Sequence, residues 1–170
     1  PWTYPLFIKN KFMNPLTAGL LWFLIDNGRC ILIAGTRSSG KTSLLIASML
    51  QIIPSTRVLT LEDTLEIPVP VFQSLGYNIT QLKSRSVITQ IKTELSADDA
   101  LRTSLRLGDS SLIVGEVRSV EARALYEAMR IGALANVVMG TIHGDSPYGV
   151  FDRVVNDLGV PPTSFKATDI

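Results

Sequence analysis

The eight residues from Gly35 to Thr42 constrain the fold of this chain more than any other stretch. They read Gly-Thr-Arg-Ser-Ser-Gly-Lys-Thr and fit the pattern G-x-x-x-x-G-K-S/T at every fixed position. The apolar run Cys30–Ala34 before them predicts a buried strand, and Ser43–Leu50 after them predicts a helix. In such a strand–turn–helix, backbone N–H groups and the positive end of the helix dipole converge on one point, which suits a polyphosphate.

This loop supplies the candidate residues for binding a nucleoside triphosphate. We expect Lys41 to reach the β- and γ-phosphates of ATP and the Thr42 hydroxyl to ligate Mg²⁺. The alternative is a Gly/Ser-rich turn that matches by chance, and the flanking strand and helix argue against it. The full candidate set for ATP is Gly35, Thr36, Arg37, Ser38, Ser39, Gly40, Lys41, Thr42 and Ser43.

Composition limits the remaining possibilities. The chain has 170 residues, enough for one domain with a sizeable core, and a net charge of +1. So small a charge gives no field that attracts nucleic acid or an acidic membrane surface. Cys30 is the only cysteine, which excludes an internal disulfide and fits a reducing compartment. The longest apolar run, Gly19–Ile25, is too short to span a bilayer, so we expect no direct membrane insertion.

Residues 1–28 predict a lead-in segment and a packing helix. Asn14 is a candidate N-cap, Pro15 suits the first helical position, and Leu16–Ile25 is apolar nearly all round, so we expect a buried helix. Residues 29–170 form the predicted core. Because the chain begins at Pro1 and ends in Ala167–Ile170, which resembles the start of another strand, we expect a fragment truncated at both ends.

Strands and helices alternate through the predicted core. Residues 67–95 are rich in loop signals, and a hairpin around Tyr77–Asn78 is one interpretation of them. The alternation predicts an α/β fold, a mostly parallel sheet with helices on both faces. Further strands are predicted at Arg57–Leu61, Ser111–Val114 and Val137–Thr141, and further helices at 96–107, 119–129 and 147–159.

Polar residues follow the ends of these strands. Glu62 and Asp63 follow the second strand, Glu116 follows the third and His143 the fourth. Ligands of open α/β sheets bind outside the carboxyl ends of the strands, so we expect these residues and the phosphate loop to converge on one edge. Glu116 is our candidate for the base that orients the attacking water, and a solvated strand-end carboxylate is the alternative.

The other candidates have equally plain alternatives. The acidic group Glu62, Asp63 and Glu66 would hold or polarise metal-bound water, or consist of ordinary loop acids. His143, the only histidine, would donate to a γ-phosphate oxygen, or be structural. Charge stabilisation would come from Arg118 or Arg106, and the alternative for Arg118 is a surface ion pair, for instance with Glu121.

These motifs resemble those of the type II/type IV secretion ATPases. Leu61–Glu66 is similar to that family's Asp box, and Leu112–Arg118 to its atypical Walker B motif, which carries Gly-Glu in place of Asp-Glu. Gly140–Gly144 is similar to its His box, and Phe7–Phe12 to the segment that leads into its ATPase domain. All occur in the family's order, and the archaeal and tight-adherence branches are the most similar.

The resemblance implies a RecA-like P-loop ATPase that assembles into a ring, usually a hexamer. Such rings hydrolyse ATP with Mg²⁺ to power secretion, pilus or archaellum assembly, or conjugative transfer. The expected location is cytoplasmic, peripheral at the inner face of the cell membrane, with inner-membrane platform proteins as partners. The family's separate N-terminal domain, which packs on the neighbouring subunit, is absent from this sequence.

The sequence departs from the family pattern in three places. Arg118–Ser119 stands where the family often has Arg-Asp, and Ile131–Ala133 stands where Thr-Gly-His is usual. The four-cysteine zinc motif of some bacterial members is missing, so no zinc is implied.

Other functions on the same fold remain open. A nucleic-acid translocase or recombinase would need a basic loop interleaved with aromatic residues. The best candidate, Lys83–Lys92, contains no aromatic residue, so we expect no nucleic-acid partner. A small-molecule kinase would need a lid of arginines, which we do not find, and a nucleotide switch without turnover is a further alternative.

Overall fold

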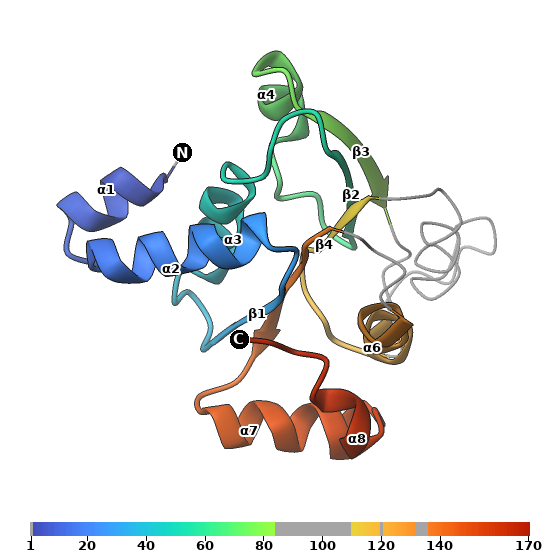
Figure 1. Ribbon diagram of the computed structural model, residues 1–170. Helices are drawn as coiled ribbons and strands as arrows, with labels where there is room; N and C mark the ends of the chain where they lie inside the picture. Colours follow the sequence, from blue (N-terminus) through green and yellow to red (C-terminus); the bar gives the residue numbers. More distant parts are fainter. Residues whose placement is uncertain (1, 84–109, 120, 132–135) are drawn as a thin grey trace.

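The structure is a computed structural model that describes residues 2–83, 110–119, 121–131 and 136–170 (Figure 1). Its centre is a five-stranded, all-parallel sheet with the strand order β1-β5-β4-β2-β3. This confirms the predicted α/β class. The strands are β1 (Cys30–Gly35), β2 (Arg57–Glu62), β3 (Asn78–Lys83), β4 (Ser111–Val114) and β5 (Val138–His143).

Both faces of the central strands β2, β4 and β5 are buried. Successive side chains of a strand point to opposite faces, and in β2 both Val58 and Leu59 are buried. Val58 packs in a cluster with Leu45 on one face of the sheet, while Leu59 packs in a cluster with Leu125 on the opposite face. Strands with two covered faces require apolar residues at nearly every position, which explains the uninterrupted apolar runs in the sequence.

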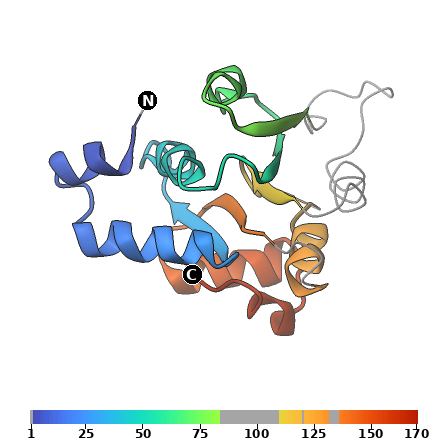
Figure 2. The same cartoon turned by 45° about the horizontal axis from the view of Figure 1, so that its top comes forward.

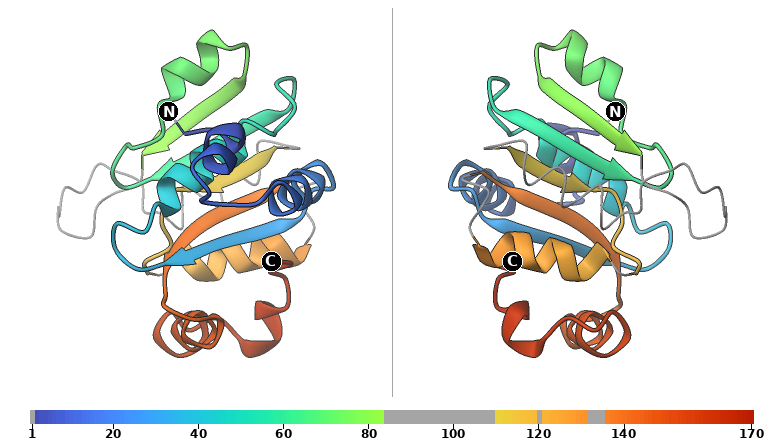
Figure 3. Two further views of the ribbon diagram at one scale, coloured as in Figure 1. Left: turned by 90° about the vertical axis from the view of Figure 1, so that its left-hand side faces the viewer. Right: turned by 90° about the vertical axis from the view of Figure 1, so that its right-hand side faces the viewer.

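Helices cover the two faces (Figures 2 and 3). On one face lie α1 (Tyr4–Lys9), α2 (Pro15–Asp26), α3 (Lys41–Met49) and α4 (Val69–Ser74). On the other, α6 (Glu121–Ile131) packs with α7 (Pro147–Asp152), its π-helical continuation (Arg153–Asp157) and α8 (Pro162–Phe165). No helix within the described residues has the length and apolar run needed to cross a bilayer.

The predicted N-cap of α2 is present, and a second side-chain cap precedes α7. The Asn14 side chain accepts a hydrogen bond from the Thr17 N–H at 2.7 Å, and the Ser146 hydroxyl accepts one from the Gly149 N–H at 3.1 Å. The predicted strand at the chain end is not formed, but its residues run beside β1. There the Asp169 N–H donates to the Cys30 carbonyl at 2.9 Å.

The hairpin interpretation of residues 67–95 is wrong for the part that is described. Residues 69–74 form α4, and β3 pairs with β2 in parallel, with Leu61 opposite Leu82. A parallel neighbour needs a crossover connection, and α4 supplies it. The predicted helix at 96–107, with Arg106, and most of the basic segment 83–92 lie outside the described residues.

The expectation of a buried second helix is also wrong. The exposed fractions are 81% for Leu16, 54% for Trp22 and 63% for Phe23, whereas Ala18 and Ile25 are buried. Only one narrow side of α2 contacts the core. The apolar composition of the helix suggested burial, but composition alone does not determine whether other elements cover a helix. The division of the chain at residue 28 stays a prediction.

Two leucine substitutions test this burial pattern. Leu45→Ala in α3, where the side chain is fully buried, should lower the free energy of unfolding by about 2–5 kcal/mol. Leu16→Ala in α2 should change it by less than about 0.5 kcal/mol. Urea unfolding measures both values. A large cost for Leu16→Ala would show that α2 is covered.

Candidate functional site

The phosphate loop joins β1 to α3 through residues 36–40. Its path requires left-handed backbone at two points, with φ +61° at Ser38 and φ +88° at Gly40. Glycine adopts this region without the steric cost that a β-carbon brings, which accounts for Gly40. No side chain caps the first turn of α3, so its N–H groups stay available to an anion.

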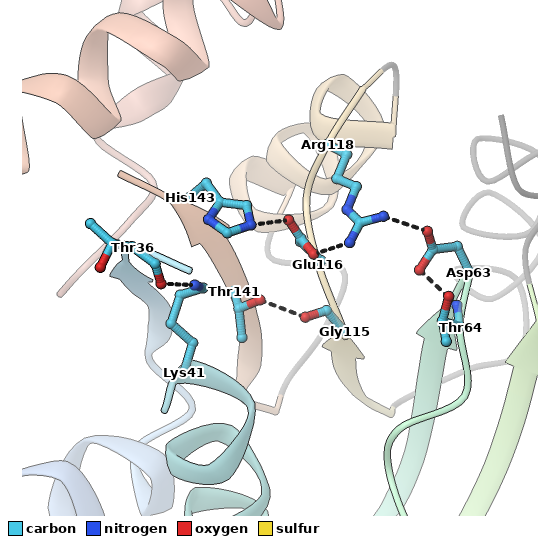
Figure 4. Close-up of polar contacts among 9 residues, drawn as sticks. All are labelled: Thr36, Lys41, Asp63, Thr64, Gly115, Glu116, Arg118, Thr141 and His143. Atoms are coloured by element: carbon cyan, nitrogen blue, oxygen red, sulfur yellow. Dashed lines mark hydrogen bonds and ion pairs between the residues drawn. The ribbon is translucent and has the colours of Figure 1, made fainter. Parts of the chain in front are cut away.

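Lys41 extends back over this loop. Its Nζ donates a hydrogen bond to the Thr36 carbonyl at 2.6 Å (Figure 4). The ammonium group is therefore held above the turn, on the side of the N-terminus of α3 that faces His143 and Glu116.

Across from the loop, three charged side chains and a histidine form a continuous chain of contacts (Figure 4). The Arg118 guanidinium donates to Asp63 Oδ2 at 2.9 Å and also to Glu116 Oε2. His143 Nε2 lies 3.1 Å from the other carboxylate oxygen of Glu116. Arg118 thus pairs with these two carboxylates, and Glu116 is held from both sides.

Glu116 is electrostatically stabilised as a carboxylate. Burial alone would raise its pKa, but the hydrogen bond from Arg118 and the charges of Arg118, His143 and Lys41 outweigh this and hold the pKa below its ordinary value. The hydrogen bond to Glu116 in turn raises the pKa of Arg118. Glu116 is therefore ionised at neutral pH and, in this arrangement, a weak base.

Glu62 differs from the other acidic residues because it is buried and fully bonded. Only 3% of it is exposed. Its Oε1 accepts hydrogen bonds from the N–H groups of Glu66 and Ile67 at 2.9 and 3.0 Å, and its Oε2 accepts one from Gln81 Nε2 at 3.0 Å. These contacts hold the turn after β2 against β3, and they leave little capacity for other ligands.

Gly115 leaves the space that Glu62 occupies. A β-carbon on Gly115 would lie 2.9 Å from Glu62 Cγ, closer than unbonded carbons approach. A glycine is therefore needed before Glu116, because the Glu62 side chain from the neighbouring strand β2 fills the space that a β-carbon would take.

The predicted convergence of strand ends is present in the structure. Glu62 and His143 are the last residues of β2 and β5, not the first residues after them as the sequence suggested. Among the other loop candidates, Gly35 ends β1, Thr36, Ser39 and Gly40 belong to the turn, and Ser43 lies in α3. A cavity of about 240 Å³ at this edge is lined by Arg37, Ser38, Lys41, Thr42, Glu62, Asp63, Thr64, Glu66, Gly115, Glu116, Arg118, Thr141 and His143.

Sequence reasoning missed two residues that support the site. Gln81 lies on β3, in the region that carried only loop signals, and binds Glu62. The Thr141 hydroxyl donates to the Gly115 carbonyl at 2.6 Å and so ties β5 to the segment after β4. Both act through strand neighbours that are far away in the sequence, so their contacts cannot be predicted locally, although Thr141 lies within the segment that resembles the His box.

A phosphate loop on the first strand of a parallel sheet, facing a strand-end glutamate, defines an α/β protein of the RecA-like P-loop class. Residues 9–168 match the family model described as "Type II/IV secretion system protein". The chain therefore belongs to the type II/IV secretion system protein family.

Individual relatives agree with this assignment. The chain is 36% identical over 147 residues to the uncharacterized protein MJ1287 of Methanocaldococcus jannaschii, covering 86% of this chain and 52% of that protein. It is 30% identical over 133 residues to the type II secretion system protein E of Pseudomonas aeruginosa, covering 78% of this chain and 24% of that protein. It thus spans about half, or less, of the length of these relatives.

Solved structures share the fold. The VirB11 ATPase of the Brucella suis type IV secretion system, in complex with sulphate, superposes with a TM-score of 0.69 at 25% identity, over 88% of this chain and 40% of that one. The Legionella pneumophila ATPase DotB superposes with a TM-score of 0.67 at 21% identity, over 98% and 42%. The second likeness shows the fold alone.

The close approach of Gly115 to Glu62 generates a stability prediction. Gly115→Ala should lower the free energy of unfolding by about 1–3 kcal/mol, because the new methyl group displaces Glu62 from its hydrogen bonds. The same substitution at Gly19, in an exposed part of α2 with open space around it, should be neutral or stabilising.

A double-mutant cycle isolates the steric cause. In a Glu62→Ala background the crowded atom is gone, so Gly115→Ala should cost much less than in the natural sequence. Urea unfolding of the four proteins measures this difference. Equal costs in both backgrounds would contradict the explanation.

Proposed function

We propose that this chain is the ATP-hydrolysing motor domain of a machine for protein secretion or for the assembly of a pilus- or archaellum-like filament. One observation carries the proposal. A phosphate loop with an uncapped helix N-terminus faces an ionised, held glutamate across a cavity of about 240 Å³. The family membership and the named ATPase relatives support the same activity.

Each side of the cavity has a distinct role in this proposal. The loop N–H groups and Lys41 bind the β- and γ-phosphates. Glu116 then faces the γ-phosphate, where it orients a water molecule for in-line attack. His143, in contact with Glu116, is placed to donate to a γ-phosphate oxygen, and Arg118 is placed to balance the developing charge.

The donor set fits Mg²⁺. Within the described residues no group of three or more acidic, histidine or cysteine side chains is placed to hold a metal by itself. Mg²⁺ commonly keeps several waters and binds through one or two protein oxygens and substrate phosphates. The Thr42 hydroxyl would supply the protein oxygen, with Asp63 and Glu66 on the same cavity wall. When bound, Mg²⁺ neutralises charge on the phosphates.

The proposed oligomeric state and partners follow from the family to which the chain belongs. We propose a homo-oligomeric ring, a hexamer by family precedent, that works at the cytoplasmic face of the membrane with inner-membrane platform proteins. The names of relatives in type II and type IV secretion systems support this assignment.

A nucleic-acid motor is the second candidate, because one relative is the conjugal transfer protein TrbB of Rhizobium radiobacter, at 29% identity. Single-stranded DNA distinguishes the two. Stimulation of ATP hydrolysis by DNA would favour the second candidate, and no effect would favour the first.

Loss of Lys41 tests nucleotide binding. Lys41→Ala should abolish tight binding of Mg-ATP, because it removes the ammonium group that pairs with the phosphates. Lys166→Ala, which removes the same charge from an exposed site on the far side of the sheet, should leave the affinity unchanged. Titration calorimetry measures both. An unchanged affinity in Lys41→Ala would overturn the site assignment.

Loss of the Glu116 charge tests hydrolysis. Glu116→Gln should keep Mg-ATP binding but slow phosphate release about 100-fold or more, as expected when a base is removed. Glu127→Gln makes the same chemical change on the exposed side of α6 and should have no such effect. Near-normal turnover after Glu116→Gln would assign the base to another residue.

A further inference from the structure

An aromatic ring lies against the phosphate loop on the side that the acidic cavity does not occupy. Phe12 is 51% exposed, and its Cζ lies 3.9 Å from the position that a β-carbon on Gly40 would take. Phe12 belongs to the turn between α1 and α2. These helices lie on one side of α3, and β2 and β3 lie on the other (Figures 1 and 2).

The ring is held in place by the residues before it. Lys11 adopts the left-handed region with φ +57°, which is strained for a residue with a side chain. The Phe12 N–H donates to the Phe7 carbonyl at 2.9 Å and so closes the turn. Phe12 then stacks on the buried Phe7, with ring centroids 4.7 Å apart, and Phe7 stacks on Trp2 at 5.2 Å.

Folding alone does not account for this position. Half of the Phe12 surface stays in water, so much of the stabilisation that comes from burying a phenyl ring is not realised. The turn also carries the strain at Lys11. A fixed aromatic ring beside a phosphate loop, supported from beneath and open above, has the form of a stacking surface.

The geometry points to the occupant. In the proposed function the γ-phosphate faces Glu116, so the α-phosphate, ribose and base leave the loop on the opposite side of the N-terminus of α3. Phe12 approaches the loop at Gly40, and it is not among the residues that line the cavity with Glu116. We propose that Phe12 is the platform on which the purine base of the bound nucleotide stacks. This inference rests on the proposed function, and it adds a base-binding residue outside the phosphate loop and outside the cavity that holds Glu116.

Stacking on one ring has a recognisable specificity. Adenine and guanine both present a broad π-face, so Phe12 supports purines in general and does not by itself choose between them. Stacking on Phe12 adds affinity only for a ligand that carries a base. Inorganic tripolyphosphate occupies the phosphate loop but has no base, so its affinity does not depend on Phe12.

Three ligands and three variants test the proposal. Mg-ATP, Mg-ADP and Mg-tripolyphosphate are titrated into the natural chain and into Phe12→Ala, Phe12→Leu and Phe12→Trp. Loss of the ring should weaken ATP and ADP equally, by about 5- to 150-fold, and leave tripolyphosphate unchanged. Phe12→Trp should keep the affinity, and its fluorescence should change with ATP but not with tripolyphosphate. Phe12→Leu keeps apolar bulk over the loop and serves where Phe12→Ala does not fold.

Phe23→Ala is the matched control, since Phe23 is an exposed aromatic of α2 with 63% of its surface accessible. It should leave all three affinities unchanged. Equal weakening of tripolyphosphate in the Phe12 variants would make Phe12 a support of the loop and overturn the proposal, as would unchanged ATP affinity. Failure of the phosphate-loop assignment is distinct, because the natural chain would then bind no Mg-ATP at all. Failure of the proposed motor activity is distinct as well, because a loss of hydrolysis would leave these affinities unchanged.

Discussion

Parallel pairing between β1 and β5 fixes where the phosphate loop meets the rest of the site. Their register sets Gly35 opposite His143, so the loop begins level with the histidine that faces Glu116. On the other side of β5, Val114 pairs with Gly140, which brings the segment after β4 to the same edge. A slip of one residue would turn every β5 side chain to the opposite face and separate these groups.

The segment that carries Glu116 is not a free loop. The Gly115 N–H donates to the Leu61 carbonyl at 2.9 Å, and the Val117 N–H donates to the Thr141 carbonyl at 2.8 Å. Glu116 is therefore fixed between bonds to two neighbouring strands, while buried Glu62 fills the space beside Gly115. A carboxylate held in this way needs little reorganisation to act, which is the property that electrostatic catalysis requires.

The sequence was informative wherever a property is local. Strand β4 was predicted at its observed bounds, the Asn14 cap was identified, and the strand-end rule brought Glu116 and His143 to the phosphate loop. It failed where a property depends on distant neighbours. The sequence did not predict the exposure of α2, the parallel pairing of β3, or the contacts that Gln81 and Thr141 make. These features depend on packing and register between segments that lie far apart in the chain, so the sequence of one segment does not determine them.

Lys41 and Arg118, two of the cations that line the cavity, are bound to oxygens of their own chain, and in the proposed function this links nucleotide binding to hydrolysis. Lys41 donates to the Thr36 carbonyl, and Arg118 donates to Glu116 and Asp63. In the proposed function a triphosphate competes for both groups, because a charged phosphate oxygen accepts a stronger hydrogen bond than a carbonyl. When Arg118 leaves Glu116, the largest influence that lowers the Glu116 pKa is lost, and the carboxylate becomes a better base. In the proposed function, the exchange of partners that seats the nucleotide would therefore also make Glu116 a stronger base.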